Sequence, residues 1–479
     1  MRLNKIRLPK DKPIYYSKVV AEFLSDETSS KISMEVDDLS FTFPNGNVGL
    51  HHVEISEEHG TLVGIMGASG AGKSTLLNVL CGIEKPSRGS VKINGIDIHN
   101  NPEKVEGVVG YIPQDDLLLE DLTVYQNLYY NAKLCFADKA EEELDELVMT
   151  TLHNLGLVPT KDLKVGNPLK KTISGGQRKR LNIGLELIRE SSVLFVDEPT
   201  SGLSSRDSEN VMDLLRELSL KGKVIFVVIH QPSSDIYKMF DKIFILDTGG
   251  YPIYNGNPVE AVSYFKKLDN QINAEEGECV KCGHVEVELI FNIIESQVID
   301  EYGEYTGERK MTPKRWNRKF LENIKHEKVE TQTEKPKGSL DRPNKIKQWI
   351  IFTTRDLLSK LSNRQYLAIN LLEAPLLAII LAFTIRYVEG AEKTGYAFGK
   401  NENAPAYLFI CIIVALFMGL TVSAEEIVKD RRIRKREAFL NLSNSSYFIS
   451  KMGILFFISA VQTLSFVLIG NWILGISGM

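Results

Sequence analysis

The stretch "TLVGIMGASGAGKSTLLNVLCG", residues 61–82, decides the fold of the first half of this chain. An apolar run suited to a buried parallel strand leads into a glycine-rich loop, which leads into an apolar stretch with helical spacing. The loop, residues 67–74, fits the pattern G-x-x-x-x-G-K-[ST], whose glycines let backbone N–H groups surround a phosphate. A chance glycine turn is the alternative, and the flanking strand and helix disfavour it. The sequence therefore predicts an α/β domain that binds a nucleotide phosphate.

Individual residues of this loop have expected tasks. The ammonium of Lys73 reaches the β- and γ-phosphates of ATP, and the Ser74 hydroxyl binds Mg²⁺. The loop residues expected to bind ATP are Gly67, Ala68, Ser69, Gly70, Ala71, Gly72, Lys73, Ser74 and Thr75.

Two acids close a second apolar strand in "SSVLFVDEPTSGLSS", residues 191–205. An acid at the carboxyl end of a parallel strand lies beside the phosphate loop in this class of sheet. Asp197 is therefore expected to hold Mg²⁺, directly or through water, and Glu198 to act as the base that polarises the attacking water. The alternative, two solvated acids at a strand end, is disfavoured once the phosphate loop is present.

Two further polar residues follow short apolar runs. Gln114, in "VVGYIPQDDLL", could contact Mg²⁺ or the attacking water, whereas an isolated glutamine is usually a surface residue. His230 ends the apolar run of residues 224–229 and could bond the γ-phosphate, although an isolated strand-end histidine is more often structural.

A second glycine pair opens a helix in "ISGGQRKRLNIGLEL", residues 173–187. A helix start with bare backbone N–H groups is a second anion-binding feature, about a hundred residues after the first. One ATPase site does not need two such features, so this segment raises the question of which nucleotide it serves.

The order and spacing of these motifs resemble those of an ABC-transporter ATPase over residues 32–265. The segments "ISGGQRKR", "EPTSGL" and "IHQPSSDIYKMFDKIFIL" resemble the G subfamily, the White-type half-transporters with the ATPase ahead of the membrane domain. The resemblance implies an α/β P-loop NTPase (ABC ATPase) domain followed by an α-helical transmembrane domain. It also implies that Phe43, in "LSFTFPNG", stacks on adenine; a core aromatic is the alternative.

The same resemblance answers the question of the second glycine pair. In the family this signature helix caps the ATP held by a partner subunit, so the chain is expected to form a head-to-tail dimer with itself or a related half-transporter. The residues expected to reach the partner's ATP are Ser174, Gly175, Gly176 and Gln177. One departure is Ser204, where the family has an aspartate after Ser-Gly-Leu; its absence puts tight coupling between the two sites in doubt.

Residues 266–345 are polar and are expected to form a linker, part of it with a disorder-like composition. Within it Cys279, Cys282 and His284 could supply three zinc ligands, and a redox pair or plain reduced thiols are the alternatives. Five scattered cysteines favour a reducing compartment, and a net charge of −5 gives no basic field for nucleic acid.

The last part of the chain is expected to enter a membrane. Residues 346–365 suit an interfacial connecting helix, with a soluble amphipathic helix as the alternative. Apolar runs at about residues 366–388, 404–423 and 452–476 are long enough to span a bilayer. The family has six spans, so three indicate a fragment or truncated product. A Lys/Arg cluster in loop 424–449 places that loop and the ATPase in the cytoplasm. In the subfamily this loop carries a coupling helix, and a charge run that only sets the topology is the alternative.

The sequence thus predicts the ATP-binding and ATP-hydrolysing subunit of a multi-pass membrane half-transporter, an exporter of the inner or plasma membrane. A membrane-tethered regulatory ATPase that moves no substrate is the alternative. The expected divisions are an N-terminal extension (1–31), the ATPase (32–265), the linker (266–345), the connecting helix (346–365) and the transmembrane region (366–479).

Overall fold

The structure is a computed structural model that describes residues 31–167, 172–324, 328–336, 338, 340–386, 402–424 and 426–476. The expected N-terminal extension therefore lies, up to residue 30, outside the described residues, as does most of the loop between the first two spans. The chain forms two compact units. Unit 1 comprises Met1–Asp116 and Ser174–Leu340, and unit 2 comprises Leu117–Ile173 and Asp341–Met479.

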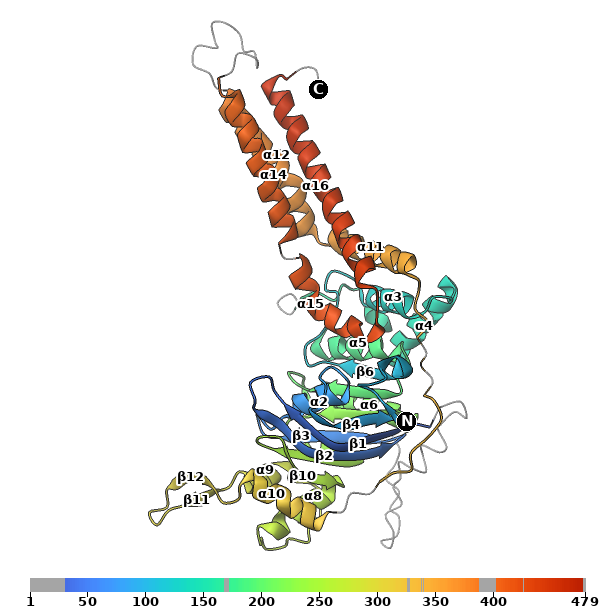
Figure 1. Ribbon diagram of the computed structural model, residues 1–479, viewed down its shortest axis with the longest axis vertical. Helices are drawn as coiled ribbons and strands as arrows, with labels where there is room; N and C mark the ends of the chain where they lie inside the picture. The colour runs from blue at the N-terminus through green and yellow to red at the C-terminus, as the bar shows by residue number, and fades with distance from the viewer. Residues whose placement is uncertain are drawn as a thin grey trace. The chain divides into compact units, whose positions relative to one another are not determined.

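A six-stranded sheet organises unit 1 (Figure 1), in the order β10-β9-β3-β8-β7-β6. All neighbouring strands are parallel except β10 and β9. The strands β3, β7 and β8 are apolar along their length and fully buried, as expected for strands covered on both faces. The strand bounds are β3 Leu62–Gly67, β6 Val109–Ile112, β7 Val193–Asp197, β8 Val224–Val228, β9 Lys242–Asp247 and β10 Tyr251–Gly256.

The register brings the ends of three strands to one edge of this sheet. Asp197 at the end of β7 pairs with Val228 at the end of β8, and β3 runs parallel to β8 and ends in Gly67. The phosphate loop, the two acids and His230 therefore leave the sheet at the same edge, as the sequence predicted for this fold class. The helices of this part are α2 Lys73–Leu80, η1 Pro102–Val105, α5 Gly175–Leu187, α6 Ser205–Leu220, α7 Ser234–Tyr237 and α8 Pro258–Leu268.

A second, antiparallel sheet of unit 1 has the order β2-β1-β4-β5. Its strands are β1 Ser33–Thr42, β2 Val48–Glu58, β4 Arg88–Ile93 and β5 Ile96–Asp97. Part of the expected linker lies along it. The backbone N–H of Val329 donates to Ser56 Oγ (2.9 Å), and that of Gln332 donates to Ser33 Oγ (3.0 Å).

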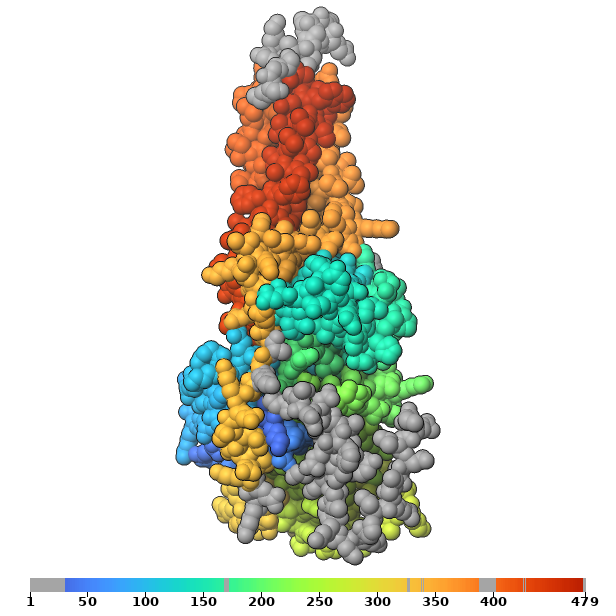
Figure 2. Space-filling model, turned by 90° about the vertical axis from the view of Figure 1, so that its right-hand side faces the viewer, coloured from blue at the N-terminus to red at the C-terminus, as the bar shows by residue number. Residues whose placement is uncertain are grey.

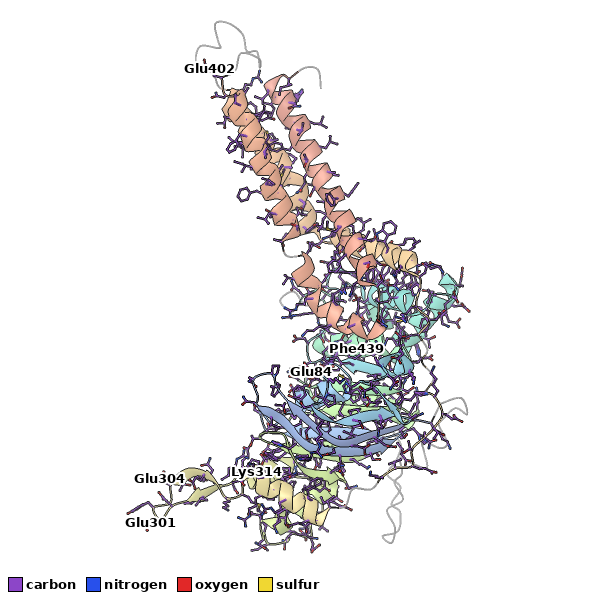
Figure 3. All side chains as sticks on the ribbon, in the orientation of Figure 1. Glu84, Glu301, Glu304, Lys314, Glu402 and Phe439 are labelled. Carbon is purple, nitrogen blue, oxygen red and sulfur yellow. The ribbon has the colours of Figure 1, made fainter. Side chains whose placement is uncertain are left out.

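The prediction of a polar linker over residues 266–345 differs from the structure. Helices α9 (Val287–Ile294) and α10 (Pro313–Asn323) belong to unit 1, joined by the hairpin β11 (Gln297–Ile299) and β12 (Tyr305–Arg309). Ile290 and Trp316 are buried in the same apolar core as the strands of the six-stranded sheet. Averaging over a polar region hid these few apolar residues. The hairpin itself is exposed, and Glu301 and Glu304 lie at its far end (Figure 3).

The regular elements among the described residues of unit 2 are helices. The first set comes from inside the ATPase sequence: α3 Val124–Cys135, α4 Glu141–Asn154 and η2 Val158–Thr160. Thr123 caps α3 through a reciprocal pair of hydrogen bonds with Gln126. The connecting helix α11 (Lys345–Ser362) lies next to this set, as Figure 2 shows in orange beside turquoise. A helix is thus present where the connecting helix was expected at residues 346–365; it begins one residue earlier and ends three residues earlier than predicted.

Within the described residues, three helices of unit 2 are long and apolar enough to cross a membrane, in agreement with the number of spans expected from the sequence. They are α12 (Arg364–Arg386), α14 (Ala404–Ser423) and α16 (Asn444–Leu474). Small residues let α12 pack closely, because Ala374, Ala378 and Ala382 are its most buried positions. Between the second and third spans lie α15 (Glu426–Glu437) and η4 (Ala438–Leu440).

Candidate active site

The loop between β3 and α2 has the backbone that a phosphate-binding loop needs. Gly72 caps α2 with a φ of 92°, a conformation that side chains with a Cβ rarely adopt. A Cβ on Gly67 would lie 2.4 Å from the carbonyl oxygen of Leu246. Both positions therefore require glycine, for backbone reasons that the sequence pattern predicted.

Lys73 is the first residue of α2 and is 7 % exposed. Its Nζ donates to the carbonyl oxygens of Gly67 (2.8 Å) and Ala68 (2.9 Å) within the loop. Burial lowers the pKa of Lys73, while the nearby carboxylates of Glu198 and Asp197 oppose that shift. The ammonium thus lies in the loop, facing the two acids.

Asp197 ends β7 and is almost fully buried. Burial and the neighbouring Glu198 raise its pKa, against the influence of Lys179, of a hydrogen bond from Ser74 and of Lys73. Its Oδ1 is buried and finds no hydrogen-bond partner among the described residues. A buried carboxylate oxygen left without a donor, beside a hydroxyl, is an oxygen pair that suits a magnesium ion. The residues therefore fit the expected Mg²⁺.

Glu198 and Gln114 meet directly. The Nε2 of Gln114 donates to Oε2 of Glu198 at 2.7 Å. Glu198 has a φ of 43°, an unusual value for a residue with a side chain, and strained backbone of this kind gathers at functional sites. Glu198 thus lies beside Asp197 and near Lys73, and Gln114 contacts Glu198.

His230 and Phe43 are near the site without entering this set of contacts. His230 follows β8 by two residues, with an exposed side chain, and Gln231 after it also has a positive φ of 42°. Phe43 is 38 % exposed and packs edge-on against Phe41, so it is a surface aromatic rather than a core residue. A Cβ on Gly49 would lie 2.6 Å from the Phe43 ring, and Gly49 itself lies beside Gly72 of the phosphate loop.

The signature helix α5 begins with a capping box. Ser174 Oγ accepts from the N–H of Gln177 (3.2 Å), and Gln177 Oε1 accepts from the N–H of Ser174 (2.8 Å). Gly176 packs against α6 so closely that a Cβ there would lie 2.5 Å from Asp207 Oδ1. Gly176 is thus required for packing within its own chain as well as for any exposed N–H groups.

Ser204, the departure from the family pattern, caps α6. Its Oγ accepts from the N–H of Asp207 (3.2 Å) and donates to Asp207 Oδ2 (2.9 Å). Sequence reasoning missed Asp207, which brings a carboxylate to the signature turn three residues after the serine. The spacing of Ser204 and Asp207 could have indicated this contact, because the third residue of a helix commonly forms a hydrogen bond with the N-cap residue.

The expected zinc site is not supported by the structure. Cys279 and Cys282 are free and exposed, and within the described ranges no group of three or more histidine, cysteine or acidic residues could hold a metal ion. The N–H groups of Cys282 and Lys281 and the Cys282 side chain lower the pKa of the Cys279 thiol. The backbone N–H of Cys279 donates to the carbonyl of His284 (2.8 Å), which closes a surface turn without gathering three ligands.

Comparisons with known proteins agree with this geometry. The profile of a family described as "ABC transporter" matches residues 50–201, and profiles described as "ABC-2 type transporter" match residues 347–478 and 230–277. The "ABC transporter G family member 28" of Arabidopsis thaliana is 37 % identical over 242 residues, which cover 50 % of this chain and 22 % of that protein. A "Broad substrate specificity ATP-binding cassette transporter" of Mus musculus is 40 % identical over 204 residues, covering 42 % and 30 %. The solved structure of cbiO1 from Clostridium perfringens aligns with 50 % of this chain and 95 % of its own, at 27 % identity and a TM-score of 0.43.

The chain therefore carries an ABC-transporter ATPase domain N-terminal to an ABC-2 type membrane domain. Its relatives include ABC G-family proteins and a "white-brown complex homolog", which confirms the predicted White-type resemblance. The chain spans about a fifth to a third of the length of the curated relatives it matches.

Proposed function

We propose that this chain binds and hydrolyses ATP as one half of a dimeric membrane exporter. The observation that carries the proposal is the Ser74–Asp197 hydrogen bond with the unpartnered, buried Oδ1 of Asp197 beside it, at the edge of the sheet where the phosphate loop begins. An ATP phosphate and its magnesium ion account for that arrangement, because a magnesium ion would take up the buried oxygen that no described donor reaches.

The chain's own residues divide the hydrolysis reaction between them. The Lys73 ammonium exchanges its two loop carbonyls for the β- and γ-phosphate oxygens. Ser74, Asp197 and Gln114 would hold Mg²⁺, which neutralises charge on the phosphates when bound. Glu198 orients the attacking water and accepts its proton, giving ADP and inorganic phosphate, and His230 bonds the γ-phosphate from the end of β8. Phe43 stacks on the adenine.

The signature turn serves the nucleotide of a second chain in this proposal. The capping box at Ser174 presents the first N–H groups of α5 at a helix N-terminus, where an anion is stabilised. One chain has one set of motifs, so two chains arranged head to tail would hold two ATP molecules. The partner is a second copy or a related half-transporter.

Unit 2 supplies a path by which hydrolysis would act on the membrane helices. Arg436, at the end of α15, donates to the carbonyl oxygen of Leu117, three residues after Gln114 in sequence. Arg355 of α11 pairs with Glu437 of α15 at 2.5 Å. The segment 424–449 therefore contacts the helical part of the ATPase sequence, as expected of a coupling element. The basic residues of α15 favour a cytoplasmic position for this segment and for the ATPase, in a plasma or inner membrane.

A mixed dimer tests the shared site. One chain would carry Lys73→Ala and the other Gly175→Asp, each with its own tag. Gly175 is a better position than Gly176, because its Cβ would meet only the Leu203 side chain at 3.2 Å, whereas that of Gly176 would meet Asp207. Each variant alone should be inactive. The co-assembled pair should regain ATPase activity, because one of its two sites combines an intact Lys73 with an intact Gly175.

The matched control is a double variant with both changes on one chain, co-assembled with wild type. In the purified dimer of one double-variant chain and one wild-type chain, each of the two shared sites contains one defect. This dimer should therefore be inactive. If purified mixed dimers of the separate variants show no activity, the head-to-tail assignment of the signature turn is wrong.

A further inference from the structure

Three side chains of the signature helix α5 hold the loop that contains Gln114. We call residues 113–116 the Gln114 loop. Lys179 Nζ donates to the carbonyl oxygens of Gln114 (2.6 Å) and Pro113 (3.4 Å). Arg178 Nε pairs with Asp116 Oδ2 at 3.0 Å, and Asn182 Nδ2 donates to the Asp115 carbonyl at 3.5 Å. Every residue of the loop is thus bonded to α5.

These contacts are buried. Arg178 and Lys179 are each 4 % exposed, and Asn182 is 1 % exposed. A buried ammonium is costly unless hydrogen bonds replace its water, and Lys179 has the two carbonyls of the Gln114 loop as acceptors. An apolar side chain could fill the same space without that cost. A lysine at position 179 therefore serves to hold the Gln114 loop in place rather than to fill space in the core.

The Gln114 loop continues the contact to the acid at the end of β7. The carbonyl of Gln114 accepts from Lys179, while the amide of the same residue donates to Glu198 at 2.7 Å. One residue thus has its backbone fixed by α5 and its side chain on Glu198. A shift of α5 would therefore move the Gln114 amide relative to the Glu198 carboxylate.

We propose that Lys179 is a positioning residue for ATP hydrolysis, which acts by fixing the Gln114 carbonyl so that the Gln114 amide reaches Glu198. This rests on the proposed function, in which Glu198 is the base. The helix whose first turn would contact the partner's nucleotide then also sets the Gln114–Glu198 contact of its own chain. Such a link couples the two sites of a dimer without using residue 204.

A double-mutant cycle on the full chain in detergent tests the link. Lys179→Met keeps the length and apolar stem but removes the donor. It should lower kcat roughly tenfold with the KM for ATP within about twofold, because small displacements of an orienting group cost rate more than binding. Gln114→Ala should lower kcat by a similar factor. If Lys179 acts through Gln114, the double variant should be no slower than Gln114→Ala alone.

Lys223→Met is the matched control. Lys223 is a half-buried lysine that also donates to a backbone carbonyl, that of Ser191, but it precedes β8 at the opposite edge of the sheet. The fold-change in kcat caused by Lys223→Met should multiply with that caused by Gln114→Ala when the two changes are combined. Asp116→Asn, which removes the ion pair to Arg178, gives a second cycle if Lys179→Met does not fold, and it too should be non-additive with Gln114→Ala.

The outcomes separate the inference from the proposed function. Multiplying effects of Lys179→Met and Gln114→Ala, or a change confined to KM, would overturn the role of Lys179. Multiplying effects of Asp116→Asn and Gln114→Ala would overturn the hold of α5 on the Gln114 loop. If Glu198→Gln hydrolyses ATP at the wild-type rate, the proposed function fails and the inference fails with it. A non-additive cycle with a multiplying Lys223 control supports both.

Discussion

Two groups of buried acids, one in each unit of the molecule, differ in what compensates their negative charge. At the sheet edge of unit 1, Asp197 and Glu198 are adjacent acids, and burial and their mutual repulsion raise the pKa of Asp197. In unit 2, burial would raise the pKa of Glu426, but the ammonium groups of Lys360 and Lys451 outweigh it and lower the pKa. Asp197 thus keeps a buried oxygen without a hydrogen-bond donor among the described residues, whereas Glu426 is held by two ammonium groups.

The paired acids form what we call the α11–α15–α16 charge cluster. A single lysine of α16, Lys451, contacts three acids: Asp356 (2.6 Å), Asp430 (2.9 Å) and Glu426 (3.2 Å). The members of the cluster are Arg355, Asp356, Lys360, Glu426, Asp430, Glu437 and Lys451. Each helix contributes at least one charge to a partner on another helix, so the cluster fixes the connecting helix and α15 to the third span.

The largest expected effect breaks one buried pair of that cluster. Arg355→Met leaves Glu437 buried without its partner, which should cost about 3–5 kcal/mol of stability in unit 2. Hydrogen exchange at the amides of α11 and α15 measures it. Lys221→Met, which removes an exposed pair with Glu217, should cost less than about 1 kcal/mol. Asp197→Asn should not measurably lower the stability of unit 1, because it removes the repulsion between Asp197 and Glu198. Equal losses of stability in all three variants would show that the two groups of acids do not differ.

The next effect concerns chemistry rather than stability. Glu198→Gln should slow phosphate release roughly 10²-fold or more while ATP stays bound, since a general base contributes about that factor. Nucleotide retention and phosphate release should be followed in one preparation. Lys73→Ala is the control and should lose binding instead. Turnover near the wild-type rate in Glu198→Gln would show that the unsatisfied acids are not catalytic.

The two units also differ in how their stability depends on pH. Burial raises the pKa of Glu57 in unit 1 to about 7, although Lys242 opposes the shift. The folded state then binds more protons than the unfolded state between about pH 4.5 and 7, so unit 1 becomes less stable as pH rises through that window. For Glu426 the pKa is lowered, and stability of the cluster is lost only as pH falls below its usual range.

We therefore expect unit 1 to be more stable at pH 5.5 than at pH 7.5, by roughly 1–2 kcal/mol once solvent relaxation is allowed for. Hydrogen exchange at β2 amides in wild type and in Glu57→Gln measures it. The variant should lose the pH dependence. A dependence that survives the substitution would assign it to another group.

The smallest effect concerns Ser204. Ser204→Asp would place a second carboxylate where Ser204 Oγ now donates to Asp207 at 2.9 Å. The single variant should therefore gain little in the Hill coefficient for ATP. The exchange Ser204→Asp with Asp207→Ser keeps one carboxylate and one hydroxyl and should raise the coefficient more. Equal coefficients in wild type, single and double variants would show that this position does not influence coupling.

The phosphate loop and the parallel sheet could be predicted from the sequence because each is encoded locally. Glycine spacing, an apolar run and a strand-end acid are each recognised within a stretch of about twenty residues. The contact between Lys179 and Gln114 could not, because it joins residues 65 positions apart in sequence. The packing of Trp316 into the core of unit 1 was hidden for a different reason, since one apolar residue in a polar region does not change its average composition.

Unit 2 joins segments that leave the ribosome at different times. The strand pairing of Phe136 with Asp341, and the hydrogen bond from the Asp341 N–H to the Cys135 carbonyl (3.0 Å), connect residues more than 200 positions apart. At synthesis rates of about 5–20 residues per second, α3 waits on the order of 10–40 s before its partner segment exists. The nascent chain must therefore keep an apolar helical segment from aggregating while the rest of the ATPase, and then the membrane helices, are made.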